Sequence, residues 1–127
     1  MINLKIFLIS LATFFIISCD KSLQSGDICS VVNDSISFGA IKILAIEDSV
    51  IHIKLYRNKY YSGRPNQLNI GELTIDPDTA NLNFGIPHLA ITKSSFYKWN
   101  PKFILNENVT DEESSSCNSW NKTQINK

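Results

Sequence analysis

The chain has 127 residues with 12 basic and 12 acidic side chains, and 43% of its residues are hydrophobic. This length indicates a single domain with one core, because chains usually divide into several domains only above roughly 250 residues. The balanced charge provides no general attraction for nucleic acid, whose binding domains are usually basic, so we expect no nucleic-acid partner.

The N-terminal segment is typical of an export signal. Lys5 is the only charged residue before Cys19, and the uncharged, mostly apolar run Ile6–Ile17 follows it directly. A transmembrane helix needs roughly 20 apolar residues, so this run is too short to be an ordinary one. A basic start, a short apolar run and a small residue before the cut describe a secretory signal peptide, which we assign to residues 1–18.

The end of this run resembles the lipobox of bacterial lipoproteins. Ile16-Ile17-Ser18-Cys19 places branched apolar residues and then a small residue before a cysteine. The resemblance implies cleavage after Ser18 and lipidation of Cys19, with fatty acyl chains such as palmitate as the membrane anchor. Two or more acyl chains hold a protein stably, whereas one gives only marginal binding. The alternatives are an ordinary signal peptide with a chance cysteine and an uncleaved anchor.

Lipidation would fix the location of the protein. We expect it in the bacterial cell envelope, anchored to a membrane through Cys19 and facing the periplasm. Asp20 resembles the signal that retains lipoproteins at the inner membrane of enteric bacteria. Other lineages follow different rules, so the choice between inner and outer membrane stays open.

The cysteine count is compatible with this anchor. Three cysteines in an exported protein leave one without a partner, and lipid on Cys19 would account for it. Cys29 and Cys117 then remain, and an oxidising compartment favours a disulfide between them. In the chain-entropy model, closing a loop of about 100 residues stabilises a fold by about 4.7 kcal/mol. The alternative is two buried thiols.

The folded part should begin after a short polar tether at residues 19–26 and extend over residues 27–122. Strands are expected at 28–32, 38–46 and 50–57, with the last two forming a hairpin. In the third strand Ile51, Ile53 and Leu55 alternate with His52, Lys54 and Tyr56. Strict alternation predicts one buried face and one wet face, so we expect the second set to be exposed to solvent.

The second half of the chain should contain shorter elements. A polar, aromatic loop over 57–66 is followed by expected strands at 68–75, around Leu82–Phe84 and around Leu89–Ile91. A short helix is expected over 92–99, capped by Thr92 or Ser94 and unable to pass Pro101. A strand over 103–105 follows, and Thr110–Glu113 fits a capping box that opens a final short helix. From Ser114 the chain is polar and should fray unless Cys117 holds it, with a polar tail at 123–127.

This series of short strands predicts a mainly β (α+β) fold. We expect a small curved antiparallel sheet or a partly open barrel with one or two short helices.

No catalytic motif is recognisable in the sequence. There is no nucleophile elbow, glycine-rich phosphate loop or histidine-glutamate zinc helix, and the acidic residues fall at turns or at a helix start. His52, His88, Cys29 and Cys117 are of the types that bind zinc, but they lack close ligand spacing. We therefore expect solvated or hydrogen-bonded histidines, no metal site, no cofactor and no enzymatic activity.

One group of residues has the composition of a protein interface. Tyrosine and arginine anchor many interfaces because both bury a wide flat surface and keep a polar end. The predicted partner-binding residues are His52, Lys54, Tyr56, Arg57, Tyr60, Tyr61 and Arg64. The alternative is a solvated strand face followed by an ordinary loop.

Several short segments resemble small β-rich immunity proteins encoded beside polymorphic toxins. These segments are Gly26–Ile28, Gly39–Leu44, His52–Tyr56, Arg64–Pro65 and Gly85–Leu89. The resemblance covers residues 26 to about 105 and implies a non-enzymatic domain that binds and blocks an exported toxin. A structural or stress-related envelope lipoprotein of unknown ligand is the alternative.

Overall fold

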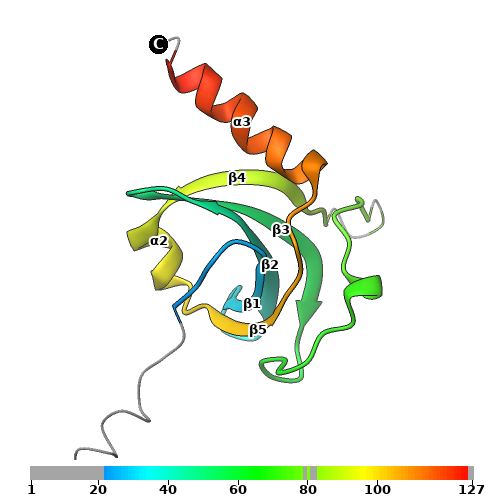
Figure 1. Ribbon diagram of the computed structural model, residues 1–127. Coiled ribbons are helices and arrows are strands. Elements are labelled where there is room, and N and C mark those ends of the chain that lie inside the picture. The colour runs from blue at the N-terminus through cyan, green and yellow to red at the C-terminus, as the bar shows by residue number, and fades with distance from the viewer. Residues whose placement is uncertain (1–21, 79, 81–82, 126–127) are drawn as a thin grey trace, which may run out of the picture.

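The computed structural model describes residues 22–78, 80 and 83–125. Five strands within them form an antiparallel sheet in the order β4-β3-β2-β1-β5, and the sheet curves strongly around its core (Figure 1). The strands are β1 Asp27–Val32, β2 Phe38–Ile46, β3 Val50–Tyr60, β4 Ile86–Thr92 and β5 Lys102–Asn106. The sheet does not close into a barrel, because β4 and β5 are its two edges. The predicted fold class is confirmed.

The concave face of the sheet carries the hydrophobic core. Alternate residues of β1, β2 and β3 form it: Cys29, Val31, Ile41, Ile43, Ile51 and Ile53. The register places Cys29 beside Ile41 and Ile43 beside Ile53. Full burial of an isoleucine side chain contributes about 1.5–3 kcal/mol, so this alternation is the main reason that these segments form a sheet.

Helix α2, Lys93–Lys98, connects the two edge strands (Figure 1). Thr92 caps it as predicted, because its side-chain oxygen accepts a hydrogen bond of 3.2 Å from the Ser95 amide. Phe96 is fully buried in the core cluster, and Trp99 packs against that cluster. The helix therefore covers part of the concave face where the sheet stays open.

Helix α3, Asp111–Ile125, lies against the convex side of the sheet (Figure 1). The predicted capping box is present: the Thr110 amide donates to Glu113 Oε1 at 2.9 Å, and the Glu113 amide donates to Thr110 Oγ1 at 3.2 Å. The chain does not fray from Ser114: Cys117 is buried, which is the condition under which the sequence predicted an ordered tail, and the helix continues to Ile125. Glu113 and Cys117, one turn apart, are buried against the sheet and hold it there.

The covering helix also overturns the expectation of a wet face on β3. His52 is 0% exposed, and Lys42 on β2, the register partner of Lys54, is 0% exposed as well. Alternation therefore identifies the two faces correctly, but both faces are covered. The convex face buries polar and charged side chains, such as Lys42, His52 and Glu113. These groups can bind ions or exchange protons, whereas the core residues of the concave face cannot.

The predicted strand at 68–75 is not formed. Ile70–Glu72 is instead a short 3₁₀ helix, η1. The Asn58 side chain takes the place of a strand ladder, because its amide donates to the Glu72 carbonyl at 2.8 Å and accepts from the Thr74 amide at 3.0 Å. The strand expected at 82–84 lies partly outside the described residues; Asn83 forms an isolated bridge with Asp78.

The folded domain begins earlier than the sequence indicated. Leu23 packs against the core, and the Gln24 amide donates to Asp27 Oδ2 at 2.9 Å. Gly26 adopts φ +88°, a conformation that favours glycine, and a Cβ there would lie 2.7 Å from the Glu107 carbonyl oxygen. Residues 23–26 are thus part of the domain rather than of a tether. The signal peptide and Cys19 lie outside the described residues.

Candidate functional site

The seven predicted partner-binding residues separate into three environments. His52, Lys54 and Tyr56 lie on the convex face of β3, where His52 is buried and the other two are half-buried. Arg57 and Arg64 are half-buried and bonded to the domain itself. Tyr60 is half-buried, whereas Tyr61 is 65% exposed. The seven side chains therefore do not form one continuous surface.

The two arginines hold the loop that follows β3. Arg57 Nη1 donates to the Asp76 carbonyl at 2.8 Å. Arg64 Nη1 donates to Ser30 Oγ at 2.8 Å, and its guanidinium lies 4.8 Å from the centre of the Phe38 ring. A guanidinium at this distance from an aromatic face makes a favourable cation–π contact. Arg64 thus has a positioning role toward its own domain.

Residues 59–65, the end of β3 and the loop after it, are here called the tyrosine loop and carry the accessible part of the predicted cluster. It lines a surface hollow of about 470 Å³ that contains Tyr60 and Tyr61. Burial, with a smaller effect from Glu72, raises the pKa of Tyr60. An anchored loop with an exposed tyrosine can contact a partner at a low cost in conformational entropy.

A charged network fills the convex face beneath the start of α3. Lys42 Nζ contacts Glu113 Oε1 at 3.0 Å, Glu107 Oε1 at 3.3 Å and the Asn108 carbonyl at 2.9 Å. Lys54 forms a second ion pair with Glu113. Both lysines therefore share one buried carboxylate, so this strand face directs its charge inward instead of toward solvent.

The electrostatics of Glu113 follow from these contacts. Burial by itself would raise the pKa of this carboxyl. The hydrogen bonds from Lys54, from the Thr110 amide and from Lys42 outweigh that effect and lower the pKa to about 2. Glu113 is therefore ionised at neutral pH, as its two lysine partners require.

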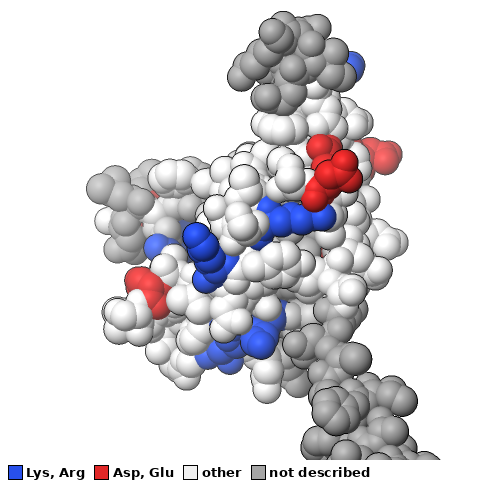
Figure 2. All heavy atoms as spheres, turned by 90° about the vertical axis from the view of Figure 1, so that its left-hand side faces the viewer, with Lys and Arg blue, Asp and Glu red and all other residues white. Residues whose placement is uncertain are grey.

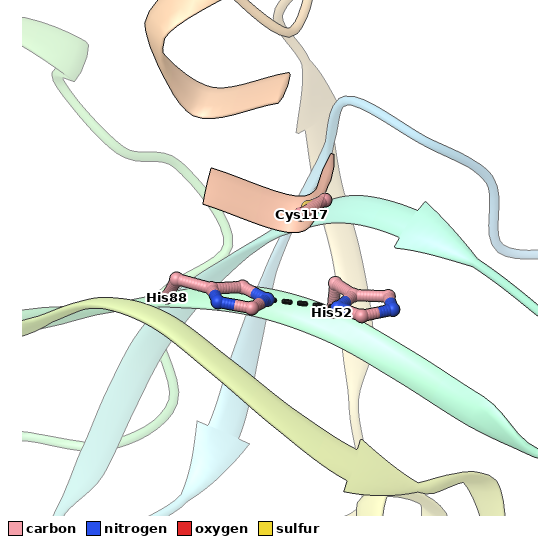
Figure 3. Close-up of side chains that lie close together, drawn as sticks. All are labelled: His52, His88 and Cys117. Carbon is pink, nitrogen blue, oxygen red and sulfur yellow. Dashed lines mark hydrogen bonds between the residues drawn. The ribbon is translucent and has the colours of Figure 1, made fainter. Parts of the chain in front are cut away.

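A second cluster lies nearby, where β3, β4 and α3 meet. His52, His88 and Cys117 each direct a potential ligand atom toward the others, and these atoms all lie within 4.8 Å of one another (Figure 3). His52 Nδ1 and His88 Nε2 are 2.8 Å apart, with ring planes inclined by 10°. Trp120 of α3 meets His52 edge-on, with ring centres 4.9 Å apart. Of the two states expected for the histidines, His52 is therefore hydrogen-bonded and not solvated.

Two pKa shifts describe the polarity of this cluster. Burial lowers the pKa of His88, and the neighbouring His52 lowers it further. Burial raises the pKa of the Cys117 thiol, and the carboxylate of Glu47 adds to this effect. The neutral forms of both groups are thus favoured in the protein as it stands.

The predicted disulfide between Cys29 and Cys117 is not formed. Cys29 belongs to the core cluster on the concave face, whereas Cys117 lies with His52 and His88 on the convex face. The sheet itself separates the two sulfur atoms. The same separation removes Cys29 from the zinc-type set considered from the sequence and leaves the other three residues together.

The signal for the convex-face site was present in the sequence in part. Glu113, Cys117 and Trp120 are spaced four and three residues apart, which places them on one side of a helix. The position of His88 depends on the β3–β4 register, which the sequence does not reveal: His88 lies two residues from Ala90, the register partner of His52, and therefore on the same face of the sheet. Lys42 gave no sign of burial, because an alternating strand normally exposes its lysines.

Charges on the molecular surface are mixed. Figure 2 shows the face that includes α2, with basic side chains across its middle and acidic side chains toward its margins. A continuous basic stripe, as nucleic-acid-binding domains present, does not appear on this face.

Among the described residues, no helix has the length and apolar character needed to cross a bilayer. Comparison of the chain with protein-family models, with curated proteins and with solved structures finds no match.

Proposed function

We propose that this protein is a lipid-anchored, non-enzymatic binding domain of the bacterial cell envelope. In this proposal its partner is an exported toxin, which the domain inhibits by occupying part of the toxin surface. The anchor is the lipid on Cys19, and the contact surface is the tyrosine loop.

The anchor is supported by the order of features at the N-terminus. A single basic residue, a short apolar run and the sequence Ile16-Ile17-Ser18-Cys19 follow one another without interruption. The domain already includes Leu23, so only three residues separate it from Cys19. Three extended residues span about 10 Å, so a lipidated Cys19 would hold the domain directly at the membrane surface.

The contact surface is supported by one observation, the exposure of Tyr61 on an anchored loop. Its side chain is 65% exposed beside a hollow of about 470 Å³. Arg64 holds the loop through Ser30 and Phe38, so little ordering is needed when a partner binds. Exposed tyrosines on rigid loops are frequent centres of binding energy.

The test begins with the gene beside this one. If it encodes an exported toxin, that toxin is produced in the periplasm with and without this protein, and cell survival is measured. Protection by the wild-type chain, together with direct binding of the two purified proteins, is the expected result. A toxin that kills equally in both strains would contradict the proposed inhibition.

Substitutions then examine the surface. Tyr61→Ala should weaken binding about thirtyfold, as expected when a side chain contributing about 2 kcal/mol is truncated. Tyr97→Ala is the matched control, because Tyr97 is 55% exposed on α2, outside the tyrosine loop. Arg64 is left intact because its loss would release the loop. Equal affinities of the Tyr61 and Tyr97 variants would exclude the tyrosine loop as the contact surface.

A further inference from the structure

We propose that His52, His88 and Cys117 form a binding site for one Zn²⁺ ion. The three residues come from β3, β4 and α3, and their ligand atoms lie within 4.8 Å of one another (Figure 3). Two imidazole nitrogens and a thiolate are a normal zinc ligand set, with a water molecule as the fourth ligand. This inference concerns the convex face and is independent of the proposed function.

The two histidine nitrogens are close to the spacing that this ion requires, and the Cys117 sulfur lies within 4.8 Å of both. Zinc–nitrogen bonds of about 2.0–2.1 Å at a tetrahedral angle place two ligand nitrogens about 3.3 Å apart. His52 Nδ1 and His88 Nε2 are 2.8 Å apart, so they would have to separate by about half an ångström. His88 is half-buried and lies on an edge strand, which leaves it room to move.

A second observation points to the same ligand. His52 Nε2 is buried and makes no hydrogen bond. Among the described residues it is the one buried side-chain nitrogen or oxygen atom in this state. Glu47 Oε1 is 3.2 Å away but is not aligned for one. Metal on Nδ1 would fix the proton on Nε2, and metal-bound histidines usually donate that proton to a carboxylate. Glu47 is within reach of this role after a small rotation of the ring.

The surroundings favour retention of a bound ion. His52 and Cys117 are buried, and the Trp120 ring covers His52 from the helix side. Access remains through the half-buried His88. When zinc binds, the Cys117 thiol loses its proton to solvent and the thiolate becomes a ligand, so the charge of the ion is partly neutralised at the site.

Zinc at this position would also attach α3 to the sheet. Among the residues of α3 whose burial is described, Glu113 and Cys117 are the buried ones, and both are polar or weakly polar. Trp120, which is half-buried, adds a contact with His52. A metal bond through Cys117 would add a strong attachment one turn beyond Glu113.

The experiment uses the untagged full chain in detergent with Cys19→Ser in every sample, so that Cys29 and Cys117 supply the thiols. Co²⁺ serves as the spectroscopic probe, and Zn²⁺ affinity is measured by displacement of Co²⁺ and by calorimetry. We expect one ion per chain and a thiolate-to-Co²⁺ charge-transfer band in the near ultraviolet. Cys117→Ser should abolish this band, and the control Cys29→Ser should retain it.

Two further variants keep the result interpretable if Cys117→Ser does not fold. His88→Gln changes a half-buried residue and should lower Zn²⁺ affinity at least tenfold. Glu47→Gln should lower it about 10- to 100-fold, the range for loss of a partner that orients a metal ligand. Circular dichroism verifies the fold of each variant. The proposal is overturned if no ion binds to the folded wild-type chain, if the band is insensitive to Cys117, or if His88→Gln binds Zn²⁺ as wild type.

Discussion

Replacement of Glu113 by glutamine should destabilise the domain by about 3 kcal/mol at pH 7. Removing one partner of a buried ion pair typically costs about 3–5 kcal/mol, because the remaining charge stays buried without compensation. Lys42, which is 0% exposed, would keep Glu107 and the Asn108 carbonyl, so the lower end of that range applies. The pKa of Glu113, lowered to about 2, agrees in direction, because it shows that the fold favours the ionised carboxylate.

Glutamine is the informative substitution here. Its side-chain oxygen can still accept from the Thr110 amide, so the capping box is preserved and the charge is what changes. Glu112→Gln is the matched control, since Glu112 is exposed in the same helical turn and its loss should change stability by less than about 0.5 kcal/mol. Urea denaturation followed by circular dichroism measures both variants. Destabilisation of the two variants by the same amount would refute the assignment of Glu113 as the shared partner of the buried Lys42 and the half-buried Lys54.

Three further predictions concern acid stability, the contacts of Gly85 and the lipid on Cys19. Acid should destabilise the wild-type protein between pH 4.5 and about 2. The pKa of Glu113 is lower in the folded chain than in the unfolded one, so its contribution to the free energy of unfolding is complete above pH 4.5 and is lost as the pH falls toward 2. In denaturation experiments at graded pH, the stability of Glu113→Gln should decline less steeply, and an equal decline in both proteins would contradict this. Gly85→Ala should lower the melting temperature strongly, since its Cβ would lie 2.6 Å from Ile75 Cα and 2.7 Å from the Leu55 carbonyl oxygen. Gly39→Ala is the control, because its Cβ would meet only the Val31 side chain, at 3.6 Å. Equal melting temperatures of the two variants would show that the backbone at Gly85 relaxes freely. Cys19→Ser should abolish metabolic labelling with palmitate and release the protein from membranes or leave it unprocessed; undiminished labelling would exclude Cys19 as the lipid site.

The sheet was predictable because its signals are local. Alternating Ile41, Ile43, Ile51 and Ile53 indicated the buried face of the hairpin, and the Thr110–Glu113 spacing indicated the start of a helix. These patterns depend on strand and helix geometry alone. Predictions from these patterns are therefore independent of how the rest of the chain folds.

The convex face was not predictable in the same way. The burial of Lys42 and His52 depends on α3, whose polar composition gave no reason to expect it against the sheet. The partners that make the burial of Lys42 favourable, Glu107, the Asn108 carbonyl and Glu113, lie 65 to 71 positions away in the chain. The pairing expected for Cys29 and Cys117 failed for a related reason, since residue type and compartment carry no information on which side of a sheet each sulfur lies.

The order of strands has a consequence for the way this chain acquires its structure. The β2–β3 hairpin is formed from neighbouring segments, but β1 pairs with β5 as well as with β2. One edge of β1 therefore stays unpaired until β5 is available, and non-local pairings of this kind form slowly. A chain that leaves the cytoplasm N-terminus first would complete its sheet only after residue 106 has emerged. If the protein is exported as proposed, this topology would delay final folding until the strands have crossed the membrane, so the chain would stay unfolded while it is translocated.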